Sequence, residues 1–394
     1  MMLSAGAGSY RVKNSMRRTA LALGLDRHEA HVTLTEITAT SHRGPIFRTE
    51  VAEQRAIGVN ADRLDRLASF VAGTRPELSV DEVEAELDRI EERPPLYGPA
   101  VTAGAVALAC AAFAFLNNGG PLECAAVFVA AGLGQTLRGL LQRRHLNQFA
   151  VTALAAAVAC SLYALVVLGL ERLDLADPSQ EAGYISAVLF LVPGFPLVTA
   201  VLDLVRLDIS AGISRVVYTA MILLSTGMSV WVIAMVAGME SAPAQAHLQG
   251  VLLVVLQLLA SAVAAGGFAL LFNTPARVAL ISAGIGGIAN VGRLVLIHAG
   301  MAGQAATLLA AVAVGLLAAA VVARTNLSRV TLSVPAVVIM VPGVAVYRAL
   351  VHLNNGEISA ALGSGVEATI VIIAIGVGLA VSRMLTDRGW AFDR

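Results

Sequence analysis

Charged residues are scarce in this sequence: Asp, Glu, Lys and Arg make up 14% of its 394 residues, against about 25% in soluble domains. The one lysine, Lys13, stands beside 26 arginines and the formal net charge is zero, which argues against a nucleic-acid surface. The three cysteines lie in apolar segments, without the spacing of a disulfide framework or a metal site. The sequence has no Gly-rich nucleotide-binding loop with its lysine, so nothing indicates ATP as an energy source.

The chain is instead rich in apolar residues, and its few charges are concentrated at the start. Hydrophobic residues make up 57% of the sequence, and the mean hydropathy is +0.77. Before Gly98 there are 13 Lys+Arg and 15 Asp+Glu, which leaves 14 and 12 for the other 297 residues. The first 20 residues are basic and have no apolar core, so they do not form a signal peptide. We therefore expect a soluble domain over residues 1–97, in the cytoplasm, followed by a membrane domain.

Residues 1–97 have the pattern of a small α+β domain. The pattern predicts a helix over 15–25, extended runs over 31–41 and 46–54, and a capped amphipathic helix over 60–71. Ser79-Val-Asp-Glu82 is a capping box that opens a last helix, which runs to about residue 92.

Ten apolar runs after Gly98 are long enough to cross a bilayer, which takes about 20 residues each. They lie near residues 98–116, 122–141, 149–170, 184–205, 213–238, 248–272, 276–299, 301–323, 331–353 and 359–384. The loops alternate in charge, with most arginines at one side and acidic residues gathered at the other. The fold class is therefore a polytopic α-helical membrane protein, and by the positive-inside rule both termini, including the tail 385–394, are cytoplasmic.

The fourth and the ninth runs are interrupted at their centres by the same residues. Leu191-Val-Pro-Gly-Phe-Pro196 breaks the fourth, and Met340-Val-Pro-Gly-Val-Ala345 breaks the ninth. Proline removes a helical hydrogen bond that lipid cannot replace, so such a break persists only where protein or a water-filled cavity surrounds it. We expect a binding site at the two breaks, although a simple kink is the alternative. The residues concerned are Pro193, Gly194, Phe195, Pro196, Pro342 and Gly343.

The two breaks belong to a longer internal repeat. An offset of 149 residues aligns the two Val-Pro-Gly segments, and an offset of 155 aligns Gln135-x-x-Arg138 with Asn290-x-x-Arg293. The offset changes because the loop after the third helix has 13 residues in the first half and 7 in the second. Each repeat, 98–238 and 248–384, holds five helices, an odd number, so the two repeats are inverted in the membrane. Chance similarity among helices rich in small apolar residues is the alternative.

Polar groups beside the breaks are candidates for the chemistry, because ionisable residues within a membrane are costly and usually functional. Thr199, Asp203 and Arg206 share one face of the fourth helix. Asp203 is a candidate proton carrier with Arg138 or Arg206 as its partner, and a structural pair with Arg206 near the helix end is the alternative. The repeat places Arg348, His352 and Asn355 on the same face of the ninth helix.

Three further groups complete the candidate site. The paired units Gln135/Arg138 and Asn290/Arg293 could bind a carboxylate through arginine, with snorkelling to the interface as the alternative. Glu367, deep in the tenth helix and aligned with Tyr218, is a second proton candidate. Backbone N–H groups at 195–198 and 344–347, the latter ending at Tyr347, could also bind a carboxylate together with Arg348.

Several segments resemble the signature of one known family. They are residues 191–204, LVPGFPLVTAVLDL, with Ser210-Ala-Gly-Ile-Ser-Arg215 after them, Val341-Pro-Gly-x-x-x-Tyr-Arg-Ala-Leu350, Gly24-Leu25, and a strand that ends in His42-Arg-Gly44. On these segments the chain resembles the threonine/serine exporter family over most of its length, with both membrane halves fused in one chain. One departure is Thr199, where the family motif has Asn.

The resemblance implies a secondary transporter of the bacterial inner membrane that exports L-threonine and L-serine by proton antiport. We expect no enzyme activity, no cofactor and no metal, and as partners a small amino or organic acid, protons and the lipid bilayer, with a homo-oligomer left open. Related two-subunit members are associated with succinate, so dicarboxylate export is the alternative. A channel or an intramembrane enzyme is a further alternative, but no nucleophile–base pair or metal cluster is visible.

Overall fold

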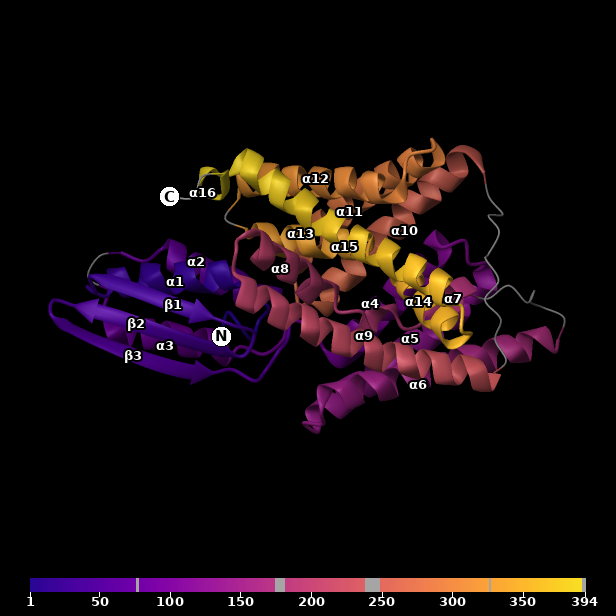
Figure 1. Cartoon of the computed structure of the whole chain (residues 1–394), viewed down its shortest axis with the longest axis horizontal. Coiled ribbons are helices and arrows are strands. Elements are labelled where there is room, and N and C mark those ends of the chain that lie inside the picture. The colour runs from indigo at the N-terminus through magenta and orange to yellow at the C-terminus, as the bar shows by residue number, and fades with distance from the viewer. Residues whose placement is uncertain (76–77, 174–180, 238–248, 326, 392–394) are drawn as a thin grey trace.

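The computed structural model describes residues 1–75, 78–173, 181–237, 249–325 and 327–391 (Figure 1). In this part of the chain eight helices are long and apolar enough to cross a membrane, and two bent helix pairs would bring the total to ten. The eight are α4 (Pro99–Leu116), α5 (Pro121–Arg143), α6 (Gln148–Glu171), α9 (Ile209–Ala237), α10 (Gly250–Leu271), α11 (Ala276–His298), α12 (Gly303–Val322) and α15 (Ile358–Thr386). The protein is therefore a polytopic helical membrane protein.

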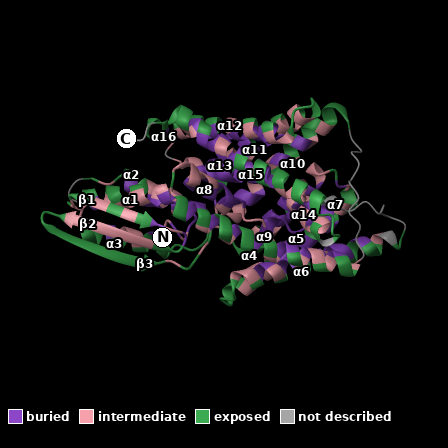
Figure 2. Cartoon of the chain, in the orientation of Figure 1, coloured by how far each residue is buried: buried purple, intermediate pink, exposed green. Residues whose placement is uncertain are grey.

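A small α+β region precedes the helical bundle. It consists of α1 (Ser9–Ala22), β1 (Arg27–Val32), β2 (Glu36–Arg43), β3 (Ile46–Glu53), α2 (Ala61–Ala72) and α3 (Val80–Glu91). The strands form an antiparallel sheet in the order β1-β2-β3, and β3 is exposed along its whole length (Figure 2). Asn60 caps α2 and the capping box at Ser79 opens α3, as the sequence predicts.

The single extended run predicted over 31–41 is wrong, because the chain turns at residues 33–35. The Thr33 side chain accepts hydrogen bonds from the backbone N–H of Thr35 and Glu36, at 3.4 and 3.1 Å, which closes a local turn. The run therefore divides into the end of β1 and the start of β2. Helix α1 also begins at Ser9, six residues earlier than the sequence pattern predicts.

The two bent pairs lie where the sequence places the breaks. In the first, α7 (Glu181–Ser186) and η1 (Leu189–Leu191) are followed by α8 (Gly194–Val205) after a bend of 64°. In the second, α13 (Arg329–Val338) is followed by α14 (Gly343–Asn354) after a bend of 48°. Pro193 and Pro342 both have φ −80° and ψ 60°, and each break is closed by an N–H···O bond of 2.8 Å between residues two apart. Both breaks are thus inverse γ-turns.

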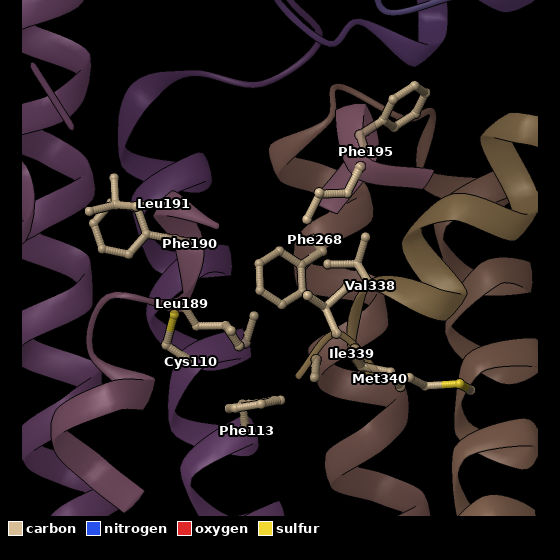
Figure 3. Packing of buried hydrophobic residues seen from close by; sticks show 14 of the residues in the cluster. Cys110, Phe113, Leu189, Phe190, Leu191, Phe195, Phe268, Val338, Ile339 and Met340 are labelled. Atoms are coloured by element: carbon tan, nitrogen blue, oxygen red, sulfur yellow. The ribbon is translucent and has the colours of Figure 1, made fainter. Parts of the chain in front are cut away.

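The two breaks pack against each other through equivalent residues, 149 positions apart. A methyl group at Gly194 would lie 2.9 Å from the side chain of Val338, and one at Gly343 would lie 3.3 Å from Leu189. Adding 149 to 194 gives 343, and adding 149 to 189 gives 338. Leu189, Phe195 and Val338 are among the buried side chains in Figure 3. Glycine at both positions permits this close approach.

A second pair of helix contacts obeys the same offset. A methyl group at Gly227 of α9 would overlap Leu350 of α14, and one at Gly376 of α15 would overlap Val201 of α8. Adding 149 to 227 and to 201 gives 376 and 350. The break residues and the helices beside them therefore make matched contacts in the two halves.

The α+β region contacts one end of the bundle, here called the domain end; the opposite end is the far end (Figure 1). The backbone of Ala61 donates to Phe272 O at the end of α10, and the Arg11 side chain donates to Ser328 at the start of α13. The C-terminal α16 (Arg388–Ala391) lies at the same end, where Trp390 contacts Tyr10 at 6.1 Å between ring centroids.

Candidate functional site

A cavity of about 360 Å³ extends from the domain end of the bundle to the first break. Its polar lining comes from α4, α5, α6 and α9, and its inner wall is the break itself, residues 190–196. Residues 57–59, between β3 and α2, line the cavity from the α+β region. The polar side chains that line it include Gln135, Arg138, Gln148, Thr152 and Tyr218.

Arg138 is the cation of this cavity. Its Nη1 donates to the carbonyl oxygen of Phe190, which lies just before the break, at 3.3 Å, and it lies near enough to Tyr218 to interact electrostatically. All residues lining the cavity are described, and none of them is acidic. A guanidinium that faces a cavity without a carboxylate partner is a ready site for a carboxylate ligand.

Neutral polar groups surround this arginine. The Oε1 of Gln135 is buried and has no hydrogen-bond partner among the described residues, while Tyr218 is hydrogen-bonded to Gln148. Sequence reasoning identified Gln135 and Arg138, but it did not assign Gln148 or Tyr218 to the site. The signal for Tyr218 is its alignment with Glu367 in the internal repeat.

The backbone at the first break has fewer free N–H donors than the sequence predicts. The N–H of Gly194 is bonded to Val192 O, Pro196 has no N–H, and the N–H of Leu197 is bonded to Pro193 O. In the first turn of α8 this leaves the N–H of Phe195 available. The expected group of N–H donors over 195–198 is therefore wrong, and Arg138 carries the charge of the site.

Asp203 has a different partner from the one that the sequence analysis expects. Its carboxylate is 2% exposed and pairs with Nε of Arg215, from α9, at 3.0 Å. The expected partner Arg206 instead stacks on Tyr10, with its guanidinium carbon 4.1 Å from the ring centroid. The second expected partner, Arg138, lies in the cavity. Arg215 is charged within an apolar run, which is the signal that could have identified it.

The start of the chain is bound to this ion pair. The backbone N–H of Ser9 donates to Asp203 at 2.9 Å, and Arg215 donates to the carbonyl oxygen of Ala7 at 2.6 Å. Gly6 has φ +97°, and a methyl group there would lie 3.1 Å from the ring of Phe195. The N-terminal residues are therefore packed between the first break and α9, which places the α+β region beside the cavity.

Other predicted residues lie outside the cavity. Thr199 Oγ1 donates to the carbonyl oxygen of Phe195 in its own helix at 3.0 Å, His352 is bound to Glu357 at 2.5 Å, and Tyr347 is buried against Tyr184. None of these, nor Arg348, is among the residues that line the cavity. Glu367 is exposed on α15.

Asp65 of α2 holds the α+β region to the second bent pair. Its carboxylate accepts a hydrogen bond from Thr331 Oγ1, near the start of α13, at 3.0 Å, and Arg11 is close by. Burial raises the pKa of Asp65 to about 6, against the opposing effects of Thr331 and Arg11. The carboxyl group of Asp65 therefore titrates in a range that cells reach.

This raised pKa predicts a pH dependence of stability. Because the folded-state pKa exceeds the unfolded value, the stabilisation is complete below about pH 4, and about 3 kcal/mol is lost as the pH rises from 4 through 6. Asp65→Asn should flatten this part of the profile, while Glu84→Gln, an exposed control, should not. The measurement is the unfolding temperature of purified protein between pH 4 and 8. Identical profiles for wild type and Asp65→Asn would contradict the assignment.

The fold and the site together define a class of protein. A multi-pass helical bundle with two broken spans and a polar cavity that ends at one break is typical of secondary transporters. The chain belongs to the threonine/serine exporter family. The family model described as "Putative threonine/serine exporter" matches residues 1–237, and the model "Threonine/Serine exporter, ThrE" matches residues 257–385.

Individual relatives fall into two groups. The "Probable threonine/serine exporter" of Mycobacterium tuberculosis is 26% identical over 407 residues, which covers 98% of this chain and 74% of the relative. The "Probable succinate transporter subunit YjjP" of Escherichia coli K12 is 29% identical over 233 residues, 58% of this chain and 88% of the relative. Its Klebsiella aerogenes counterpart is 28% identical over 230 residues, 58% of this chain and 87% of the relative. No solved structure matches the chain.

Proposed function

We propose that the protein exports L-threonine and L-serine across the bacterial inner membrane, in exchange for protons. The observation that carries the proposal is the position of Arg138, a guanidinium in a cavity that reaches the first break and has no acidic lining residue. Membership of the exporter family supports an amino-acid cargo. The domain end is then the cytoplasmic side, with residues 1–97 as a cytoplasmic domain and both termini inside.

The cargo is oriented by the groups around Arg138. Its carboxylate binds the guanidinium and the free N–H of Phe195, as a charge-assisted fork does in other carboxylate sites. In this proposal the unpartnered Oε1 of Gln135 accepts from the cargo's ammonium group, and Tyr218 and Thr152, which also line the cavity, bind its hydroxyl. A cavity of about 360 Å³ lies within the usual range for small-molecule sites.

Transport then proceeds by alternating access between two inverted repeats, residues 98–238 and 248–384. The matched contacts of the two breaks support this relation. The cavity reaches the first break from the domain end, and beyond it the two breaks are packed together around a space of about 40 Å³ with apolar walls that include Val192, Leu197 and Val341. In this proposal the structure corresponds to the inward-facing state of the cycle, and the apolar residues at the two breaks close the path toward the far end.

The proton is carried by Asp203 or Glu367. Asp203 is a buried carboxylate of α8, the helix that follows the first break, and the positive charge of Arg215 can balance its negative charge when the proton leaves. Glu367 is exposed on α15, nine residues after the first residue of that helix. Both belong to helices that flank the breaks, so either can be coupled to their movement.

Dicarboxylate export is the second candidate. The cavity offers a cation and no anion, which leaves the ammonium group of an amino acid without a charged partner. This favours an anionic cargo such as succinate, and the names of two relatives agree with it. Both candidates share the same binding site at Arg138.

Counterflow in proteoliposomes tests the proposal. Vesicles loaded with unlabelled cargo should accumulate radiolabelled threonine or serine, and an imposed pH gradient should drive net flux. Accumulation of succinate without threonine or serine would select the second candidate. Flux that neither saturates nor shows counterflow for any of the three would indicate a channel and would contradict the proposal.

A further inference from the structure

The cavity residues Arg138 and Tyr218 have counterparts in the second half that differ in charge. The offset of 155 pairs Arg138 with Arg293, and the offset of 149 pairs Tyr218 with Glu367. Arg138 and Arg293 each stand five residues before the end of their helices, at Arg143 and His298. Tyr218 and Glu367 each stand nine residues after the first residue of α9 and α15. The counterparts therefore have the same depth in the bundle, measured from opposite ends.

In this structure the described residues show no ion pair between the two counterpart residues. Asn290, the counterpart of Gln135, is 1% exposed; it donates to Ser261 at 2.9 Å and accepts from Nε of Arg293 at 2.9 Å. Glu367 is exposed on α15, and the described residues show no ion pair between it and Arg293. The second polar set is thus closed on itself, while the first set lines an open cavity.

Glu367 is a charged residue on an apolar surface of α15. Val366 and Ile370 beside it are 55% and 44% exposed, so this part of α15 presents an apolar surface. A carboxylate on such a surface, within a helix long enough to cross the membrane, is costly unless it meets a partner in some state. Its counterpart Tyr218 lies in the cavity beside Arg138. By the repeat, the partner of Glu367 is therefore Arg293, the counterpart of Arg138.

We propose that Glu367 is the release residue for the cargo: when the far end opens, it meets Arg293 as Tyr218 meets Arg138 here, and it displaces the cargo carboxylate. This inference rests on the proposed transport function, and it names the residue that favours release of the cargo at the far end. At the domain end the arginine faces a neutral tyrosine and binds an anionic group without competition. At the far end the equivalent arginine is neutralised by glutamate, so the cargo leaves.

The direct test measures the KM for cargo separately from each side of the membrane, in proteoliposomes that hold the protein in one orientation. Glu367→Gln should lower the KM for cargo entering from the far end by about tenfold, a common size for such coupling, and leave the KM at the domain end unchanged. Tyr218→Glu is the matched variant and should raise the KM at the domain end. Glu357→Gln, at the far-end start of α15, is the control that should change neither value. Equal shifts on both sides, or no shift, with Glu367→Gln would overturn the proposal.

A cross-linking test separates this proposal from the choice of cargo. In a background without the three native cysteines, the double variant Arg293→Cys/Glu367→Cys should form a cross-link with a short bifunctional mercurial or maleimide in membranes. Arg138→Cys/Tyr218→Cys is the positive control, because those residues are neighbours in this structure. If the control pair reacts and the 293/367 pair never does, the proposal is wrong even if transport is confirmed. If both pairs react but no cargo is transported, the proposed function has failed and the geometry stands.

Discussion

Replacing Arg138 with glutamine should raise the KM for export by about 100-fold, because truncating one partner of a buried charge pair costs about 3 kcal/mol. Arg138 is the charged group in a cavity lined by no acidic residue, so no other lining side chain can replace its charge. The measurement is initial export rate against cargo concentration in proteoliposomes, with protein amount and folding matched by gel filtration.

Two further variants separate charge from general disturbance at this position. Arg138→Lys keeps the charge but loses the planar fork, so an intermediate KM is expected. Arg144→Gln removes an exposed arginine at the end of the same helix and should leave transport unchanged. If Arg138→Gln and Arg144→Gln behaved alike, the cavity would not be the cargo site.

Replacing Arg215 with methionine should destabilise the protein by about 3–5 kcal/mol, because the Asp203 carboxylate would be left buried without a partner. The pair is nearly inaccessible, with side chains 2% and 3% exposed, so water cannot take the place of the guanidinium. The change also removes the hydrogen bond to the carbonyl oxygen of Ala7. The expected result is a large fall in unfolding temperature in detergent.

The double variant Asp203→Leu/Arg215→Met is the control for this prediction. It removes both charges, so most of the lost stability should return, since two buried charges are replaced by apolar side chains of similar size. A double variant that is as unstable as the sum of the two single variants would contradict a specific ion pair. It would indicate instead that each side chain is needed for separate contacts.

The sequence predicts the breaks well because their cause is local. Proline and glycine at 193–194 and 342–343 interrupt the helical hydrogen bonds wherever they stand in a span, and both breaks are present. The γ-turn geometry at these prolines could not be read from the sequence, because it depends on how the two breaks pack together. The ten predicted spans correspond to the eight long helices and two bent pairs.

Side-chain partners that are far apart in the sequence could not be predicted from it. Spacing along α8 favoured Arg206 as the partner of Asp203, but helix packing brings Arg215 from α9 to it, and Arg206 stacks on Tyr10 instead. The buried position of the first nine residues was also outside the reach of a sequence pattern, since their contacts are about 200 residues away. Gln135 and Arg138 were identified because they recur in the repeat, and the structure places both in the cavity.

The central claim is that the cavity at the first break holds the cargo in the inward-facing state. It is tested most directly by Gln135→Cys in a background without the native cysteines, labelled with a membrane-impermeant maleimide. The account predicts faster labelling from the domain side than from the far end, and protection by saturating threonine or serine, or by succinate if that is the cargo. Labelling that none of these compounds slows, or a cysteine that is reached from the far end as readily as from the domain end, would contradict it.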